Sequence, residues 1–411
     1  MIKLPDGWEV KKLKDLGIFI RGVSYKKEQL LNEKDENSVF LLRANNIQSQ
    51  LNLDELQIVP KELAENKIIQ DNDILFAMSS GSKHIVGKNI ILKDLNDFSF
   101  GAFCGVFRAT DESLNPYFLS YYLKSFEYHK YIQGVSKGSN INNLRFKDLE
   151  DFQIPLPSLE EQRKIVKIFD EKFASIDESI RLAKVDLLNL DELWQSILND
   201  SFNPLKSKLD NDTYMLPPTW KWEKLGDICE KIKNANLKDF NDDISYIDIS
   251  SIDNKNFMIL DYKKINNTQA PSRAKRQVKF GDILYATTRP NLKNIAMVNQ
   301  EYYNPIASTG FCIIRAKKDV KKYIFYFLLS DYVTDFVARF IKGAQYPAVS
   351  DKDIFNIQIP LPPLKEQECI TKELESKAKT IKELKELYIK RLKDYEELKE
   401  SLLDLAFKGG L

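Results

Sequence analysis

The chain of 411 residues carries one pattern twice. Leu-Pro-Asp-Gly-Trp at 4–8 returns as Leu-Pro-Pro-Thr-Trp at 216–220, 212 positions later. Asn-Asp-Ile-Leu at 72–75 returns as Gly-Asp-Ile-Leu at 281–284, now 209 positions later. A repeat of this length indicates a duplicated structural unit, and a chain this long exceeds the usual size of one compact core. We therefore expect two similar globular units.

The spacing between the two copies becomes constant in their last part. Ile-Pro-Leu-Pro at 154–157 returns at 359–362, 205 positions later, and this offset holds as far as Phe202 and Phe407. Loops absorb inserted residues, whereas one residue added to a helix rotates everything beyond it by about 100°. The constant offset therefore predicts a helix in each copy that sets a distance.

The segments after Pro157 and Pro362 have the apolar spacing of a coiled coil. Apolar residues recur at alternating intervals of three and four: Ile165, Phe169, Phe173, Ile176, Ile180, Ala183, Leu187, Leu190, Trp194 and Ile197 in the first, and Ile370, Leu374, Ala378, Ile381, Leu384, Tyr388, Leu392, Tyr395, Leu398 and Leu402 in the second. Each segment predicts a rod of about 60 Å. If the second globular unit lies at the far end of the first helix, the second helix must return antiparallel beside it. Two separate helical hairpins remain an alternative.

The globular segments predict an α+β fold. Alternating or continuous short apolar runs at 244–249, 74–76 and 90–92 are typical of strands, and aromatic-rich segments at 117–123 and 323–329 of helices. We expect two target-recognition-sized domains and two long antiparallel coiled-coil helices, in a dumbbell with a pseudo-two-fold axis. The expected boundaries are 1–157 for the N-terminal domain, 158–203 for the first helix, 204–362 for the C-terminal domain and 363–411 for the second helix.

Composition indicates a soluble globular protein. Hydrophobic residues make up 43% and charged residues 29%, with a formal net charge of +1. The first ten residues do not have the pattern of a signal peptide, and no stretch reaches the roughly 18 apolar residues of a membrane span, so we expect a cytoplasmic protein. The four cysteines lie far apart and predict ordinary buried thiols.

Basic residues are concentrated in particular regions despite the near-neutral total. Residues 263–293 contain eight Lys or Arg against Asp282 alone, and segments 77–93 and 130–147 contain basic residues without any acid. Such stretches can hold the phosphates of a nucleic acid. For any single residue the alternative is a solvated, Lys-rich loop.

Several polar side chains in these stretches can read base edges, since Arg pairs with guanine and Asn or Gln with adenine. The candidate DNA-binding residues are Ser80, Ser82, Lys83, His84, Lys88, Asn89, Asn140, Asn142 and Arg145 in the first copy, and Arg273, Lys275, Arg276, Arg289, Asn291, Lys293 and Gln345 in the second.

The residues needed for catalysis are scarce. Only His84 and His129 are present, which rules out a histidine metal cluster or a doubled histidine-based site. The glycines and lysine at 81–88 depart from the spacing of a phosphate-binding loop. We expect neither a catalytic site nor a metal site in this chain.

The repeated motifs resemble those of the type I restriction-modification specificity subunit. They are the Leu-Pro-x-x-Trp opening, the central Asp-Ile-Leu turn, the Ile-Pro-Leu-Pro-x-Leu-x-Glu-Gln segment and the closing Ser-Leu-Leu-Asp-Leu-Ala-Phe-Lys-Gly. The resemblance implies a non-catalytic subunit with two target-recognition domains. Each would read half of a split double-stranded DNA target, and the two helices would measure the spacer.

The resemblance also implies partners and cofactors. Two methyltransferase subunits and possibly restriction/translocase subunits would bind this chain, and S-adenosylmethionine, Mg and ATP would bind those partners. One departure is Asn72, where the second copy, like the family, has Gly281; the geometry of that turn is left open. A non-DNA scaffold or coiled-coil tether is the alternative from another class, and an enzyme of unrecognised type is a third.

Overall fold

The computed structural model describes residues 5–48, 50–81, 85–136, 143–237, 240, 242–317, 320–343 and 347–410. The chain forms two compact units, one made of Met1–Ala183 with Lys390–Leu411 and the other of Lys184–Ile389. The long helices α4 (Leu159–Phe202) and α9 (Leu364–Phe407) run through both units. Each unit is therefore completed by parts of both helices.

The first unit contains two small sheets packed face to face. One has the order β2-β8-β5-β6 with antiparallel neighbours; the other has the order β4-β3-β7, in which β3 and β7 are parallel. The strands are β1 (Glu9–Lys12), β2 (Gly17–Arg21), β3 (Ser38–Leu42), β4 (Gln57–Pro60), β5 (Ile74–Ala77), β6 (Asn89–Ile91), β7 (Phe98–Phe100), β8 (Cys104–Ala109) and β9 (Gln153–Leu156), and the helices are α1 (Pro116–Tyr122), α2 (Phe126–Ser136) and α3 (Phe146–Glu150). Strands β1 and β9 pair antiparallel.

The second unit repeats this plan. Its sheets have the orders β14-β11-β18-β15 and β17-β16-β19, and β10 pairs with β20 as β1 does with β9. The strands are β10 (Lys221–Lys224), β11 (Asp243–Ile247), β12 (Ile252–Asp253), β13 (Met258–Ile259), β14 (Lys263–Asn266), β15 (Ala274–Gln277), β16 (Ile283–Ala286), β17 (Ile295–Met297), β18 (Pro305–Ser308), β19 (Phe311–Ile314) and β20 (Gln358–Leu361), and the helices are α5 (Leu225–Ile228), α6 (Lys321–Leu328), α7 (Asp331–Ala338) and α8 (Asp351–Phe355). The predicted α+β class is confirmed.

Strands β5 and β16 show why these segments are continuously apolar. Ile74 and Phe76 enter the core beneath the helices, whereas Leu75 and Ala77 enter the core between the two sheets. The residues of β16 alternate between the corresponding two cores of the second unit in the same way. Because successive side chains of a strand point to opposite faces, a strand buried on both faces must be apolar throughout.

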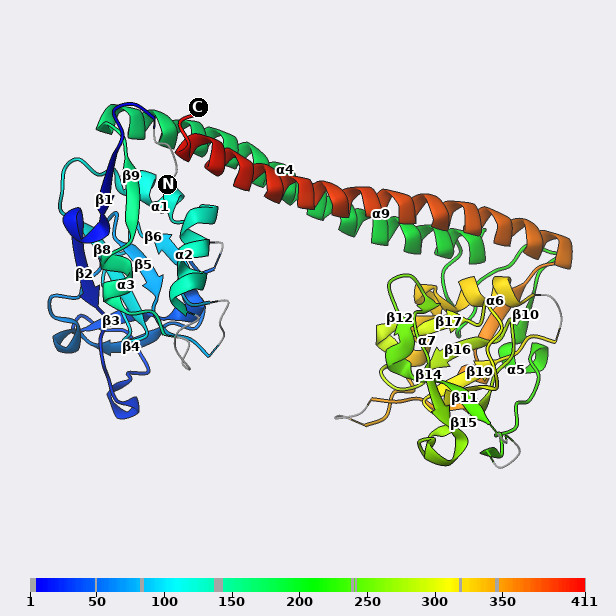
Figure 1. Cartoon of the computed structure of the whole chain (residues 1–411). Coiled ribbons are helices and arrows are strands. Elements are labelled where there is room, and N and C mark those ends of the chain that lie inside the picture. The colour runs from blue at the N-terminus through cyan, green and yellow to red at the C-terminus, as the bar shows by residue number, and fades with distance from the viewer. Residues whose placement is uncertain are drawn as a thin grey trace. The chain divides into compact units, whose positions relative to one another are not determined.

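Helices α4 and α9 run side by side and antiparallel in each unit (Figure 1). Lys399 pairs with Asp177 in the first unit, and Lys385 pairs with Asp191 in the second. The two numbers of each pair add up to 576, so both units have the same antiparallel register. The predicted antiparallel pairing of the two helices is confirmed.

The predicted seam is only partly buried. On α4, Phe169 is fully buried, but on α9 Leu384 and Leu398 are 37% and 44% exposed, so their prediction as seam residues is wrong. Period-of-seven spacing identifies a helix face, but it does not reveal which turns of that face also pack against a globular unit. Leu374 and Leu403, which do belong to the cores of the two units, are almost completely buried.

The Asp-Ile-Leu motif forms the same ion pair in each unit. Asp73 binds Arg108 with oxygen–nitrogen distances of 2.7 and 2.8 Å, and Asp282 binds Arg315 at 2.6 and 2.8 Å. Both carboxylates are buried. Asn72 has a φ of 70° and its counterpart a φ of 88°, so Asn72 adopts the left-handed turn that glycine favours. The turn left open by the sequence is therefore the same in both units.

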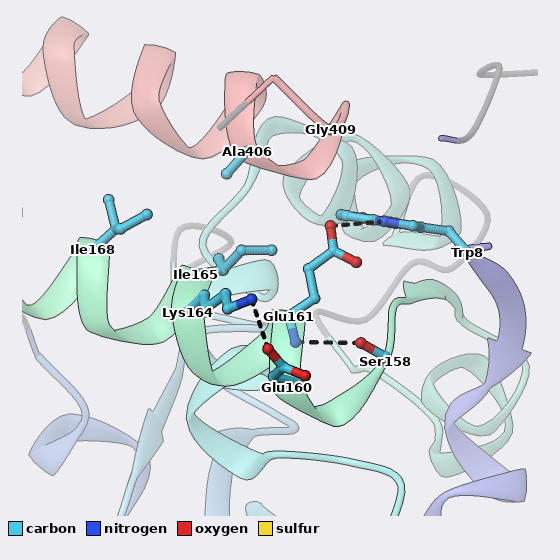
Figure 2. A pocket seen from close by; sticks show the side chains of 9 residues that line it. All are labelled: Trp8, Ser158, Glu160, Glu161, Lys164, Ile165, Ile168, Ala406 and Gly409. Carbon is cyan, nitrogen blue, oxygen red and sulfur yellow. Dashed lines mark hydrogen bonds and ion pairs between the residues drawn. The ribbon is translucent and has the colours of Figure 1, made fainter. Parts of the chain in front are cut away.

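The Trp and Glu-Gln motifs tie the first strand of each unit to its long helix. The indole nitrogen of Trp8 donates to Glu161 at 3.2 Å, and that of Trp220 donates to Glu366 at 3.0 Å. Figure 2 shows the first pair beside a small pocket, together with the Glu160–Lys164 ion pair on the same helical turn. The duplicated motifs thus have a structural role at this place.

Three cysteines, Cys104, Cys229 and Cys312, are buried, but Cys369 is exposed on α9. The prediction of a buried thiol is therefore wrong for Cys369. In the parts of the chain described above, we find no helix with the length and apolar character needed to cross a membrane.

Candidate nucleic-acid interface

In the first unit, backbone hydrogen bonds gather distant segments at one edge of the sheets. The amides of Met78 and Ser79, which follow β5, both donate to the carbonyl of Phe103, at 2.9 and 3.2 Å. The amide of Leu144 donates in turn to the carbonyl of Met78 at 2.7 Å. We call residues 78–81, 101–104 and 143–145 the first rim.

Two basic residues lie at the ends of strands that reach the same edge. The amide of Gly101 donates to the last residue of β3 at 2.9 Å, and Arg43 follows that residue. Arg21 ends β2 opposite Gly105, and its guanidinium lies 5.4 Å from the centre of the Phe146 ring. These contacts bring positive charge to the first rim from segments that the sequence analysis did not single out.

The second unit builds its edge with the same bonds. The amide and hydroxyl of Thr287 both bond the carbonyl of Gly310, at 2.8 and 3.0 Å, and the amide of Val349 donates to the carbonyl of Thr287 at 3.0 Å. We call residues 287–289, 308–310 and 347–349 the second rim. Its backbone bonds correspond one for one to those of Phe103, Met78 and their neighbours in the first unit.

Two predicted arginines meet at the second rim. The carbonyl of Arg273 accepts the amide of Thr309 at 2.8 Å, and the amide of Arg289 donates to the carbonyl of Pro347 at 2.7 Å. Both arginine side chains are exposed. Arg289 has a φ of 49°, a left-handed conformation that costs about 1–2 kcal/mol for a residue with a Cβ. Such local strain is found most often where function demands a particular geometry.

Two other predicted residues of this unit have partners inside the fold. Arg276 donates to Asp351 at 2.6 Å and Lys293 donates to Asp331 at 3.0 Å; each basic side chain is only 20% exposed. These ion pairs fix the second unit around its rim, and direct DNA contact by either residue stays a prediction.

Lys275 and Asn291 are exposed. Lys275 lies on β15, and Asn291 lies in the short 3-10 helix Pro290–Leu292 that follows Arg289. Gln345 lies outside the described residues.

In the first unit, Ser80 and Arg145 lie in the rim. Arg145 is held by a bidentate ion pair with Asp148, at 2.6 and 3.0 Å, while 78% of its side chain remains exposed. The hydrogen bond from Arg145 lowers the pKa of Asp148, which keeps that carboxylate charged and the guanidinium oriented. Arg145 therefore presents an oriented, exposed positive charge.

The remaining predictions in this unit fall in three groups. Lys88 is exposed beside the rim, and its carbonyl accepts the amide of Ala77 at 2.9 Å. The side chain of Asn89 turns into the fold and donates to the carbonyl of Leu123 at 3.2 Å. The other predicted residues lie outside the described part of the chain: Ser82, Lys83, His84, Asn140 and Asn142.

The sequence analysis missed Phe103, which lies in the first rim with 69% of its surface exposed. Matching Phe103-Cys104 with Phe311-Cys312 makes the two phenylalanines equivalent, yet Phe311 is fully buried. The structural register differs by one residue: Cys104 pairs with Ala77 as Phe311 pairs with Ala286, so Phe103 corresponds to Gly310. The Arg motif at 108 and 315, which shares this offset of 207, was the available signal.

Within the described ranges, no group of three or more His, Cys, Asp or Glu residues is placed to hold a metal ion. The features that the two rims share are exposed cations, short polar side chains and a fixed backbone. Residues 5–184 and 217–392 each match the family model described as the type I restriction modification DNA specificity domain.

The chain belongs to the type I restriction-modification specificity family. It is 30% identical to the type I restriction enzyme StySPI specificity subunit of Salmonella potsdam and 28% identical to the EcoKI specificity subunit of Escherichia coli K12, over all of this chain and 90% of each relative. The resemblance inferred from the motifs is thereby confirmed.

Solved structures show the same family fold. A chain from a type I restriction-modification complex superimposes with a TM-score of 0.78 at 21% identity, and the two chains match over their full lengths. The HsdS subunit of Thermoanaerobacter tengcongensis matches with a TM-score of 0.57, also at 21% identity, over all of this chain and 98% of the other. The two family domains each contain one of the rims described above.

Proposed function

We propose that this chain selects the DNA target of a type I restriction-modification complex by reading one half-site at each rim. The observation that carries the proposal is that both rims have the same backbone bonds but different outward side chains. Two similar readers with different contact residues should recognise two different half-sites.

The chemistry of the second rim favours guanine and phosphate. Arg273 and Arg289 converge there from segments on either side of Gly310. A bidentate Arg–guanine contact discriminates against a wrong base by about 1–3 kcal/mol, and other cations around the rim would hold phosphates. The first rim combines Arg145 with hydroxyl groups, which supports a half-site of different composition.

We propose that the chemical steps belong to other chains. The relatives are named as specificity subunits of restriction enzymes, and one solved relative comes from a structure of complex assembly in a type I system. By analogy, two methyltransferase subunits carrying S-adenosylmethionine, and restriction/translocase subunits using Mg and ATP, would bind this non-catalytic chain in the cytoplasm.

The long helices are proposed to measure the spacer between half-sites. Four residues inserted in α4, with four more opposite them in α9, would lengthen a helical rod by about 6 Å and nearly preserve the seam. The tolerated spacer should lengthen by one or two base pairs while both half-sites stay unchanged. A change in the half-site bases, with the spacer constant, would contradict this role.

The deciding experiment is to express this chain with its methyltransferase and map the methylated positions in DNA. We expect one bipartite sequence, methylated only when both chains are present, and an affinity that falls steeply with salt. Methylation by this chain alone would show that it is an enzyme.

The rival function is a scaffold or tether that grips proteins. It predicts neither a bipartite methylated sequence nor a salt-dependent affinity for DNA. Either absence, observed with a methyltransferase that is active on other targets, would favour the scaffold.

A further inference from the structure

Phe103 is held rigidly at the first rim although its ring is exposed. Its carbonyl accepts two amides from the segment after β5, and the next residue, Cys104, donates to the carbonyl of Gly101 at 2.8 Å. Single exposed apolar side chains are ordinary on protein surfaces. This one is distinguished by its position, since its backbone is part of the network that organises the rim.

The surroundings of Phe103 are polar and basic. Ser79 is bonded to it directly, and Arg43 and Arg145 lie at the ends of segments joined to the same network. A DNA major groove presents phosphates, hydrogen-bonding base edges and, as its apolar group, the 5-methyl of thymine. The ring supplies the apolar counterpart that the neighbouring side chains lack.

The second rim handles the same position differently. There the equivalent residue is Gly310, and a Cβ added to it would lie 2.8 Å from the Cδ1 atom of Ile249. The residue that corresponds to Ile249 in the first unit is the much smaller Ala44, the first residue after Arg43. A large side chain at one position thus accompanies a small one at the other, and only the first unit projects a ring.

From this juxtaposition we infer that Phe103 reads a thymine in the first half-site, through contact of its ring with the thymine 5-methyl group. The inference rests on the proposed function, because it requires that the first rim face DNA. It assigns an apolar, base-specific contact to a residue outside the basic stretches.

The test uses the complex of the full chain with its methyltransferase and the target found by methylation mapping. Each thymine of the first half-site, on either strand, is replaced by deoxyuridine, which lacks only the methyl group. We expect one replacement to weaken binding about fourfold, the value of burying one methyl-sized group. Phe103→Ala should bind thymine and deoxyuridine equally at that position, whereas Phe103→Leu should retain part of the discrimination.

Phe126 provides a matched control, since it begins α2 and is 67% exposed. Phe126→Ala should keep the full thymine preference, and neither alanine variant should alter replacements in the second half-site. The inference is overturned if no first-half thymine responds to loss of its methyl group, or if Phe103→Ala discriminates like the wild type. Those results would leave the mapped bipartite target intact, whereas absence of any such target would refute the proposed function and the inference together.

Discussion

The buried ion pairs and the exposed rims of the two units differ sharply in how much they share. Asp73–Arg108 and Asp282–Arg315 have closest distances of 2.7 and 2.6 Å, and the turn before each aspartate is left-handed in both units. At the rims the backbone bonds also correspond, but Ser80 stands where the second unit has Arg289, and Phe103 where it has Gly310. The duplicated fold thus separates a common frame from side chains that can differ.

The largest expected effect comes from breaking the common frame. Asp73→Asn and Asp282→Asn should each lower the free energy of unfolding by about 3–5 kcal/mol, because each leaves a partly buried arginine without its charged partner. Unfolding in urea, followed by circular dichroism, measures the loss.

Asp148→Asn is the matched control, since it breaks a bidentate ion pair whose arginine is 78% exposed. Its cost should stay below about 1 kcal/mol. Equal losses from Asp148 and the two buried aspartates would show that burial does not set the strength of these pairs.

The next effect separates the two rims in DNA recognition. Arg273→Ala with Arg289→Ala should weaken recognition of the second half-site by about 10- to 1,000-fold, corresponding to roughly 1–3 kcal/mol for each base contact or less if one arginine binds phosphate. Methylation rates on DNA altered in one half-site at a time measure this.

Lys263→Ala with Lys264→Ala is the control, because β14 lies at the opposite edge of its sheet from β15. It should reduce affinity only slightly and for all sequences alike. A loss of selectivity at the first half-site in the arginine variant would refute the separation of the rims.

A smaller effect should oppose stability to recognition at one residue. Arg289→Gly removes a left-handed conformation that is unfavourable for arginine, so the free energy of unfolding should rise by about 1 kcal/mol while recognition of the second half-site falls. Arg289→Ala should lose recognition without gaining stability. If glycine brings no gain in urea unfolding, the strain does not contribute to stability.

The smallest effect concerns the shared turn. Gly281→Ala should cost about 1 kcal/mol in the free energy of unfolding, because alanine strains at a φ of 88°. Gly281→Asn should cost less, since Asn72 already adopts this conformation in the first unit. Both replacements displace the Lys321 side chain in the same way, so thermal unfolding compares the turns alone. A larger loss for asparagine would contradict the equivalence.

Periodicity and repetition in the sequence predict the α+β class, the two long helices and their antiparallel pairing. These features depend on patterns within segments or on residues that recur in both copies. Individual contacts are less predictable: Arg276 and Lys293 look like free cations in a basic stretch, yet their partners Asp351 and Asp331 lie 75 and 38 positions away. Only the folded chain reveals which charges are already neutralised.

The register at Phe103 shows a second limit. Identical Phe-Cys pairs invite one alignment of the copies, but the pairing of β8 with β5 and of β19 with β16 requires an alignment shifted by one residue. A shift of one residue exchanges the two faces of a strand, so it turns a buried ring into an exposed one. Strand pairing, which the sequence does not display, decides the matter.

The composition of the first unit bears on how the chain is made. Phe407, four residues from the C-terminus, packs with Phe118, Tyr122 and Phe169 in the core of that unit. At a synthesis rate of about 5–20 residues per second, the residues between 183 and 390 take roughly 10–40 s to add. During that interval the nascent first unit lacks its closing helix, whereas the second unit has all of its residues as soon as Ile389 is added. The part of the protein that is translated first is therefore the last to be completed.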